Sequence, residues 1–157
     1  MTAETLAEAL EREHHEIDAG IEEFLARRAR RGDQAAPLRR ALSALRRHIY
    51  LEEEFVFPPL DDAGLVAPIF VMLREHGEIW LTMDEIEAQL TRAVEAGPSE
   101  ESCRELLTQL ERHNSKEEAI VYPQADATLS AETDTELRAF LASGEMPDGW
   151  RCQTVRV

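Results

Sequence analysis

Two stretches of the chain, RRHIYLEEEFVFPP at residues 46–59 and ERHNSKEEAIVYPQ at residues 111–124, share one pattern. Each has a histidine, a glutamate four residues later with a second glutamate beside it, and a proline ten residues after the histidine. Residues four apart lie one turn apart on the same helix face, so each stretch presents an imidazole and a carboxylate side by side. His48 also lies between Leu45 and Glu52 on the apolar face of its helix. The pattern therefore predicts two helices, each with an inward-facing histidine and glutamate.

Helical periodicity extends from these stretches to almost the whole chain. Apolar residues recur at helical spacing, and no strand-like alternation competes with them. The long helices expected from this spacing cover about residues 3–31, 36–56 and 65–96, and a fourth runs from a cap at Ser99 to Pro123. The breaks between them fall at Gly32-Asp33, Pro58-Pro59 and Gly97-Pro98, which are residue types that end helices.

Four long helices joined by short polar connections are typical of an antiparallel bundle. A shorter amphipathic helix follows Ser130, over about residues 131–142, and the last residues read as an irregular tail or a strap over the bundle. The predicted fold class is all-α, an antiparallel up-and-down four-helix bundle with an additional short C-terminal helix and tail. We expect a single domain over residues 1–157, with the bundle at about 3–125 and the C-terminal helix and tail at about 130–157.

The charge balance is strongly acidic, with 17 Lys and Arg against 32 Asp and Glu and a net charge of −15. Such a surface repels phosphate groups, so we expect neither nucleic acid nor a membrane surface as a partner, and the sequence indicates no particular protein partner. We expect no secretory signal in the acidic N-terminus and no membrane-spanning segment. Cys103 and Cys152 read as free thiols, which favours a reducing cytoplasmic location.

The other two long helices also share a motif, EHHEI at residues 13–17 and EHGEI at residues 75–79. In this alignment His14 matches His76. The helical stripe independently places His14 on the apolar face, whereas His15 lies on the polar side of the helix. We therefore prefer His14 to His15 as the inward-facing residue.

The chain thus consists of two copies of one helical hairpin, and each copy sends two histidines and one glutamate into the core. The candidate metal ligands are His14, His48, Glu52, His76, His113 and Glu117. Imidazole and carboxylate groups together suit iron, manganese or zinc, and two glutamates from opposite helices can bridge two ions. An extensive hydrogen-bonded network is the alternative, because buried glutamates are costly unless they are paired or bound to metal.

At these residues the chain resembles the hemerythrin-like family, also called the HHE cation-binding domain. The resemblance covers about residues 13–126 and rests on EH in the first and third helices, HxxxEExxxFP in the second and HxxxEExxxYP in the fourth. It implies a non-haem centre of two iron ions with bridging carboxylates and an oxo or hydroxo bridge, held by the six residues above. It also implies a small diatomic or peroxide ligand. Zinc or manganese could occupy the same ligands.

Two departures separate this chain from the oxygen-carrying members of that family. Those proteins have a further histidine one turn after the third-helix histidine, where this chain has Trp80. Their fourth-helix carboxylate is an aspartate five residues after the histidine, where this chain has Glu118 beside Glu117. Either glutamate could bridge, and the repeat favours Glu117. The remaining ligand set resembles the iron-repair and iron-sensing branches of the family.

Several neighbouring residues have a plainer interpretation. Phe57 and Tyr122 precede the prolines of the two motifs and are expected to plug the end of the bundle, and Glu53 and Glu118 are expected to hydrogen-bond near the ligands or to face solvent. Trp80 either shields the site or packs as a core aromatic. Three functions stay open: a module that binds or senses O2, NO, peroxide or iron; a di-iron enzyme that consumes peroxide or NO or repairs iron centres; and a metal-stabilised scaffold.

Overall fold

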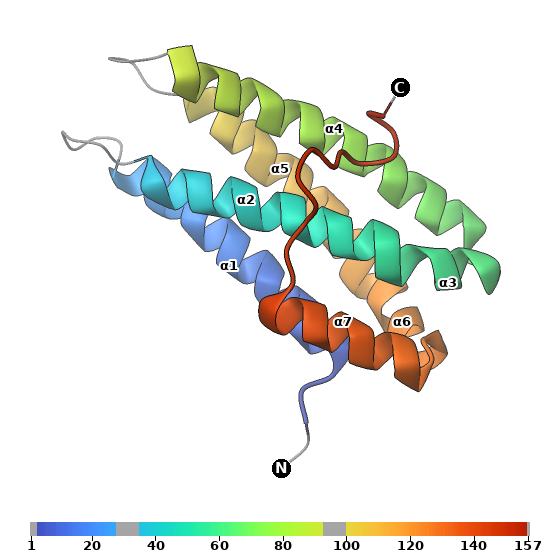
Figure 1. Ribbon diagram of the computed structural model, residues 1–157. Coiled ribbons are helices and arrows are strands. Elements are labelled where there is room, and N and C mark those ends of the chain that lie inside the picture. Colours follow the sequence, from blue (N-terminus) through green and yellow to red (C-terminus); the bar gives the residue numbers. More distant parts are fainter. Residues whose placement is uncertain (1–2, 28–34, 93–99, 157) are drawn as a thin grey trace.

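A computed structural model describes residues 3–27, 35–92 and 100–156 of the chain. Its four long helices are α1 (Leu6–Arg27), α2 (Ala36–Leu51), α4 (Val66–Arg92) and α5 (Glu100–Lys116), which lie side by side as an antiparallel bundle (Figure 1). The predicted bundle is thereby confirmed. The ends expected at Gly32-Asp33 and Gly97-Pro98, and the cap at Ser99, lie outside the described residues. Within the described ranges no helix is both long and apolar enough to cross a membrane.

The two helices that carry the repeated motif continue past their prolines. α2 leads into a π-helical segment, η1 (Glu52–Val56), and then α3 (Phe57–Asp62), while α5 leads into η2 (Glu117–Val121) and then α6 (Tyr122–Thr128). A proline inside a helix removes a backbone hydrogen bond and collides with the preceding turn. Here each proline occupies the first turn of a new helix just after the π-helical segment, where its missing N–H group costs little. The predicted ends at Pro58 and Pro123 are therefore wrong.

A layer of polar side chains divides the core of the bundle into two apolar clusters. On α1, Leu6 and Leu10 belong to one cluster, Ile17 and Ile21 belong to the other, and His14 lies between them. The same order repeats on α4, with His76 between the two clusters. Along α5 the order is reversed: Leu110 belongs to the cluster of Ile17 and Ile21, His113 follows, and the cluster of Leu6 and Leu10 is reached at Val121, beyond the end of α5. The apolar residues on both sides shield the polar layer from water, which strengthens every electrostatic interaction within it.

The C-terminal segment packs against the outside of the bundle. α7 (Ala131–Ser143) begins at Ser130, whose side chain accepts a hydrogen bond from the backbone N–H of Thr133 at 3.1 Å. The Arg47 guanidinium of α2 donates to the carbonyls of Leu141 at 3.0 Å and Gly144 at 2.8 Å at the end of α7. The tail that follows α7 (residues 144–156) then crosses α2 and reaches α4 (Figure 1). The predicted short helix and the strap over the bundle are both present.

Candidate metal centre

The structure brings the six candidate ligands together in the polar layer, each at most 3% exposed. They form two groups of potential donors, His14, His48, Glu52 and Glu117 in one, and Glu52, His76, His113 and Glu117 in the other. Within each group the ligand atoms lie within 4.8 Å of one another, and the two groups share both glutamates. We call His14 and His48 the first pair, and His76 and His113 the second pair.

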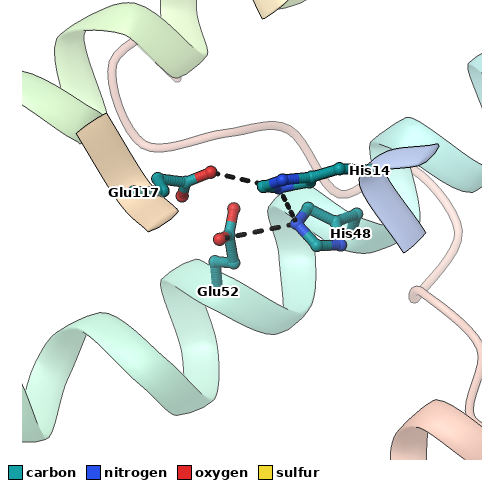
Figure 2. A group of neighbouring side chains, drawn as sticks. All are labelled: His14, His48, Glu52 and Glu117. Carbon is teal, nitrogen blue, oxygen red and sulfur yellow. Dashed lines mark hydrogen bonds and ion pairs between the residues drawn. The ribbon is translucent and has the colours of Figure 1, made fainter. Parts of the chain in front are cut away.

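The first pair approaches the two glutamates from α1 and α2 (Figure 2). The Nε2 atoms of His14 and His48 lie 3.1 Å apart. Oε1 of Glu117 lies 3.3 Å from Nε2 of His14, and Oε2 of Glu52 lies 3.5 Å from Nε2 of His48. Both rings therefore point their Nε2 atoms at one small region lined by two carboxylates.

The second pair meets the same two glutamates from α4 and α5. Oε1 of Glu52 lies 3.2 Å from Nε2 of His76, and Oε1 of Glu117 lies 3.2 Å from Nε2 of His113. Each glutamate thus touches one histidine of each pair. This is the arrangement required of a carboxylate that bridges two ions.

The other ring nitrogen of every histidine faces a further glutamate. The contacts are His14 Nδ1 with Glu118 at 2.9 Å, His48 Nδ1 with Glu13 at 2.8 Å, His76 Nδ1 with Glu53 at 2.7 Å, and His113 Nδ1 with Glu75 at 3.0 Å. A carboxylate in this position accepts a hydrogen bond from Nδ1–H, orients the ring and leaves Nε2 facing inward. Carboxylates behind metal-binding histidines have this effect in many proteins.

Two of these four outer carboxylates were expected from the sequence and two were missed. Glu53 and Glu118 follow the candidate ligands Glu52 and Glu117, and the sequence left two roles open for them, hydrogen bonding near the ligands or exposure to solvent; the structure shows the first. Glu13 and Glu75 precede the first-helix and third-helix histidines, and each holds the histidine of the adjacent helix. The repeated EH dipeptide was the signal that could have revealed them.

The polar atoms of the layer do not satisfy one another by hydrogen bonding, and they are suited to binding a cation. Four buried atoms at its centre have no hydrogen-bond partner in the described structure: Oε1 of Glu52, Nε2 of His76, Nε2 of His113 and Oε2 of Glu117. Buried polar atoms normally have partners, and leaving them unpaired is costly. Imidazole nitrogens and carboxylate oxygens that converge in this way are ligands for iron, manganese or zinc. The donor set therefore satisfies the chemistry of a metal site.

The negative charges of the layer favour protonated histidines as well as metal ions. Burial opposes a charge on His113, but the negative charge of the adjacent Glu117 carboxylate, together with the hydrogen bond to Glu75, raises the pKa of His113 to about 10. The hydrogen bond with His113 lowers the pKa of Glu75 to about 2, and the ammonium of Lys116 acts in the same direction. A metal ion that binds here must compete with these protons.

Tyr122 is a further member of the site that the sequence did not reveal. Its hydroxyl oxygen lies 2.8 Å from Nε2 of His14 and 3.2 Å from Nε2 of His48, and it donates a hydrogen bond to Oε2 of Glu52 at 2.8 Å. Burial, followed by the charges of Glu117 and Glu52, raises the pKa of Tyr122 well above its usual range. The phenol is therefore neutral and donates to the carboxylate.

Phe57 occupies the equivalent position in the other copy of the motif. Its ring stacks on His76 with ring centroids 5.3 Å apart, and it offers no polar atom. Both Phe57 and Tyr122 pack in the apolar cluster that contains Leu6 and Leu10, at one end of the bundle, as expected. The expectation was incomplete for Tyr122, because its hydroxyl also reaches the polar layer.

The structure also places the residues that the sequence left open. His15 is exposed, whereas His14 lies in the polar layer. Glu117 contacts one histidine of each pair, and Glu118 lies behind His14. Trp80 packs in an apolar cluster beside Trp150, with ring centroids 5.6 Å apart, and this packing supports its interpretation as a core aromatic.

Comparison with known families adds an independent finding. Residues 4–125 match the model of the hemerythrin HHE cation binding domain, and this range includes all six candidate ligands, the four outer carboxylates and Tyr122. Comparisons with curated proteins and with solved structures gave no match. The family and the buried histidine–glutamate groups together describe a metal-binding helical protein. The chain therefore belongs to the hemerythrin HHE cation-binding domain family.

Proposed function

We propose that the protein binds two iron ions in the polar layer, with Glu52 and Glu117 as bridges and one histidine pair as terminal ligands of each ion. The observation that carries this proposal is the sharing of both glutamates between the two donor groups. A single ion would need only one group and would leave the other group of buried donors without a charge partner. Two ions give every donor atom at the centre a partner.

Iron is the metal that we propose, and zinc and manganese are its competitors for the same nitrogen and oxygen donors. Membership of the hemerythrin family supports iron. The Tyr122 hydroxyl supplies an additional oxygen donor beside the first pair. Phenol oxygen is a favourable ligand for ferric iron, so this residue also supports the choice.

We further propose that the centre binds or senses a small ligand, namely O2, NO or peroxide, or iron itself. When bound, the metal would supply coordination positions for such a ligand and the capacity for electron transfer. The described chain contributes the rest: four oriented imidazoles, two shared carboxylates and apolar clusters that exclude water. An acidic protein with two buried free thiols is consistent with a reducing cytoplasm and with partners other than nucleic acid or membranes.

The decisive experiment is metal analysis of protein produced with ample iron, combined with optical spectra of the reduced protein before and after addition of O2, azide or NO. We expect two irons per chain and a spectral change with at least one ligand. Fewer than one metal ion per chain would reject the dinuclear site. Two ions without a response to any ligand would favour the scaffold, and turnover of peroxide or NO would favour the enzyme.

The ligand assignment is tested by a matched pair of variants in the first helix. His14→Ala removes a residue of the polar layer, whereas His15→Ala removes its exposed neighbour. We expect metal loss with the first variant only. Metal loss with His15→Ala alone would show that the inward residue has been chosen wrongly.

A further inference from the structure

The C-terminal tail reaches the carboxylate that orients His76. Oε1 of Glu53 accepts a hydrogen bond from the backbone N–H of Gln153 at 2.8 Å, while Oε2 of the same carboxylate contacts Nδ1 of His76 at 2.7 Å. The Arg156 guanidinium lies 4.0 Å from Glu53. One side chain therefore connects the tail directly to a candidate metal ligand.

The tail is seated on α4 at a position where the two copies of the motif differ. The residue after His76 is Gly77, whereas the residue after His14 is His15. A Cβ atom at position 77 would lie 2.2 Å from Oγ1 of Thr154, closer than any real contact. Thr154 in turn donates to the carbonyl of Leu73 at 3.0 Å. Glycine thus provides the space in which the tail lies against the helix.

The tail covers the outer carboxylate of only one of the two motif copies, and its own cysteine is buried. Cys152 is fully buried in the cluster that contains Trp80. The Glu53 side chain is 2% exposed, whereas the Glu118 side chain, its counterpart behind His14, is 33% exposed. The carboxylate that the tail contacts is therefore sealed, and its counterpart is open to water.

We infer that the C-terminal tail is a working part of the metal centre. The Gln153 amide fixes Glu53, and Glu53 in turn fixes the His76 ring, so retention of the ion at the second pair depends on the tail. The ion at the first pair does not depend on it. This inference rests on the proposed dinuclear site, and Gln153 and Glu53 are positioning residues that act through His76.

The test removes one hydrogen bond and leaves the rest of the tail in place. Proline has no N–H group, so Gln153→Pro removes the donor to Glu53, while Gln153→Ala keeps it and serves as the matched control. Both variants of the full chain are loaded with Fe(II) without oxygen, and release of iron to a chelator is followed. We expect Gln153→Ala to match the wild type. Gln153→Pro should hold one ion normally and the other about 10- to 100-fold more weakly, as is usual when such a partner is lost.

Gly77→Ala gives a second route in case Gln153→Pro disturbs folding. Alanine favours a helix interior, so the bundle should keep its helical content while the added methyl group displaces the tail. His15→Ala, at the equivalent position of α1, is its control. Reaction of Cys152 with a thiol reagent reports displacement of the tail.

The outcomes separate the two proposals. Wild-type protein without two bound ions contradicts the proposed function, whatever the variants do. With two ions bound in the wild type, a displaced tail or a missing amide together with unchanged retention of both ions overturns the inference. Equal weakening of both ions also overturns it, because a general loss of stability would then be the cause.

Discussion

Around the first pair the protein places the Tyr122 hydroxyl and a partly exposed carboxylate, Glu118, whereas around the second pair it places the Phe57 ring and Glu53, a carboxylate sealed by the tail. The two copies have the same order of helical elements, including the π-helical segment before each proline. The ligand types are also the same. The repeated motif thus holds the same donor set in two different surroundings.

The divergence gives the two proposed metal positions different properties. The first has an additional oxygen donor and a route for water to its outer carboxylate. The second has an apolar neighbour and a carboxylate with 2% exposure. A hydrogen bond in a dry, low-dielectric environment is stronger than one that competes with water. We therefore expect the second pair to depend more on its outer partners, and the first pair to depend more on Tyr122.

The largest loss of metal should come from a change that prevents binding at both histidine pairs. Glu52→Gln keeps the size of the side chain and removes its charge, and Glu52 contacts a histidine of each pair. We expect the metal content to fall from two ions per chain towards none, as measured by metal analysis after gel filtration. Glu111→Gln, on an exposed residue of α5, is the control. Normal retention of one ion in Glu52→Gln would show that Glu52 serves a single position.

The next largest effect should be the pH dependence of the stability of the metal-free protein. It reports on His113, a member of the second pair, and on Glu75 behind it. The pKa of His113 is raised from 6.5 to about 10, so its stabilisation is complete below pH 6.5 and is lost as the pH rises through 10. The pKa of Glu75 is lowered from 4.5 to about 2, so its contribution is complete above pH 4.5 and is lost towards pH 2. The contact between His113 and Glu75 therefore stabilises the metal-free fold most between pH 4.5 and 6.5.

Urea unfolding of metal-free protein at about pH 5.5 and about pH 9 measures this effect. We expect lower stability at the higher pH, and a weaker dependence in His113→Asn. Metal affinity should change in the opposite direction, because ions bind the unprotonated ring. Stability that rises with pH in the metal-free protein would contradict the assigned pKa directions.

Much of the centre could be predicted from the sequence because a regular helix fixes which residues share a face. For His14 and His48 a 3.6-residue period identifies the inward side without any tertiary information, and the repeated motif extends this assignment to His76 and His113. The repetition of the motif then identified Glu52 and Glu117 as partners. The bundle itself followed from the same periodicity.

The parts that the sequence did not reveal depend on local departures from that period or on contacts between distant segments. Tyr122 is nine residues after His113, which is about two and a half turns of a regular helix and places it on the opposite side. The π-helical segment η2 lies between them and changes this register. Gly77 is likewise unexplained until the tail is seen against α4. Neither feature has a signal in the periodicity.

A smaller effect should distinguish the two outer carboxylates. Glu53→Gln removes a charge from a dry position, and we expect the ion at the second pair to bind about 10- to 100-fold more weakly. Glu118→Gln makes the same change where water has access, so its effect should lie at or below the bottom of that range. Chelator competition on both variants measures the ratio. Equal losses would show that exposure does not decide the contribution of these carboxylates.

The smallest change in affinity should come from exchanging the two aromatic residues, although this exchange gives the clearest spectroscopic difference. Tyr122→Phe removes one buried hydroxyl and its hydrogen bond to Glu52, but it leaves all six candidate ligands and all four outer carboxylates in place. Ferric iron bound to a phenol oxygen absorbs visible light, so we expect the ferric wild type to show such a band and Tyr122→Phe to lack it while retaining two ions. Phe57→Tyr in the Tyr122→Phe background should restore a band from the second pair, because position 57 lies beside His76 as position 122 lies beside His14. A band that survives in Tyr122→Phe would separate the phenol from the iron, and the difference between the pairs would then rest on the outer carboxylates and the tail alone.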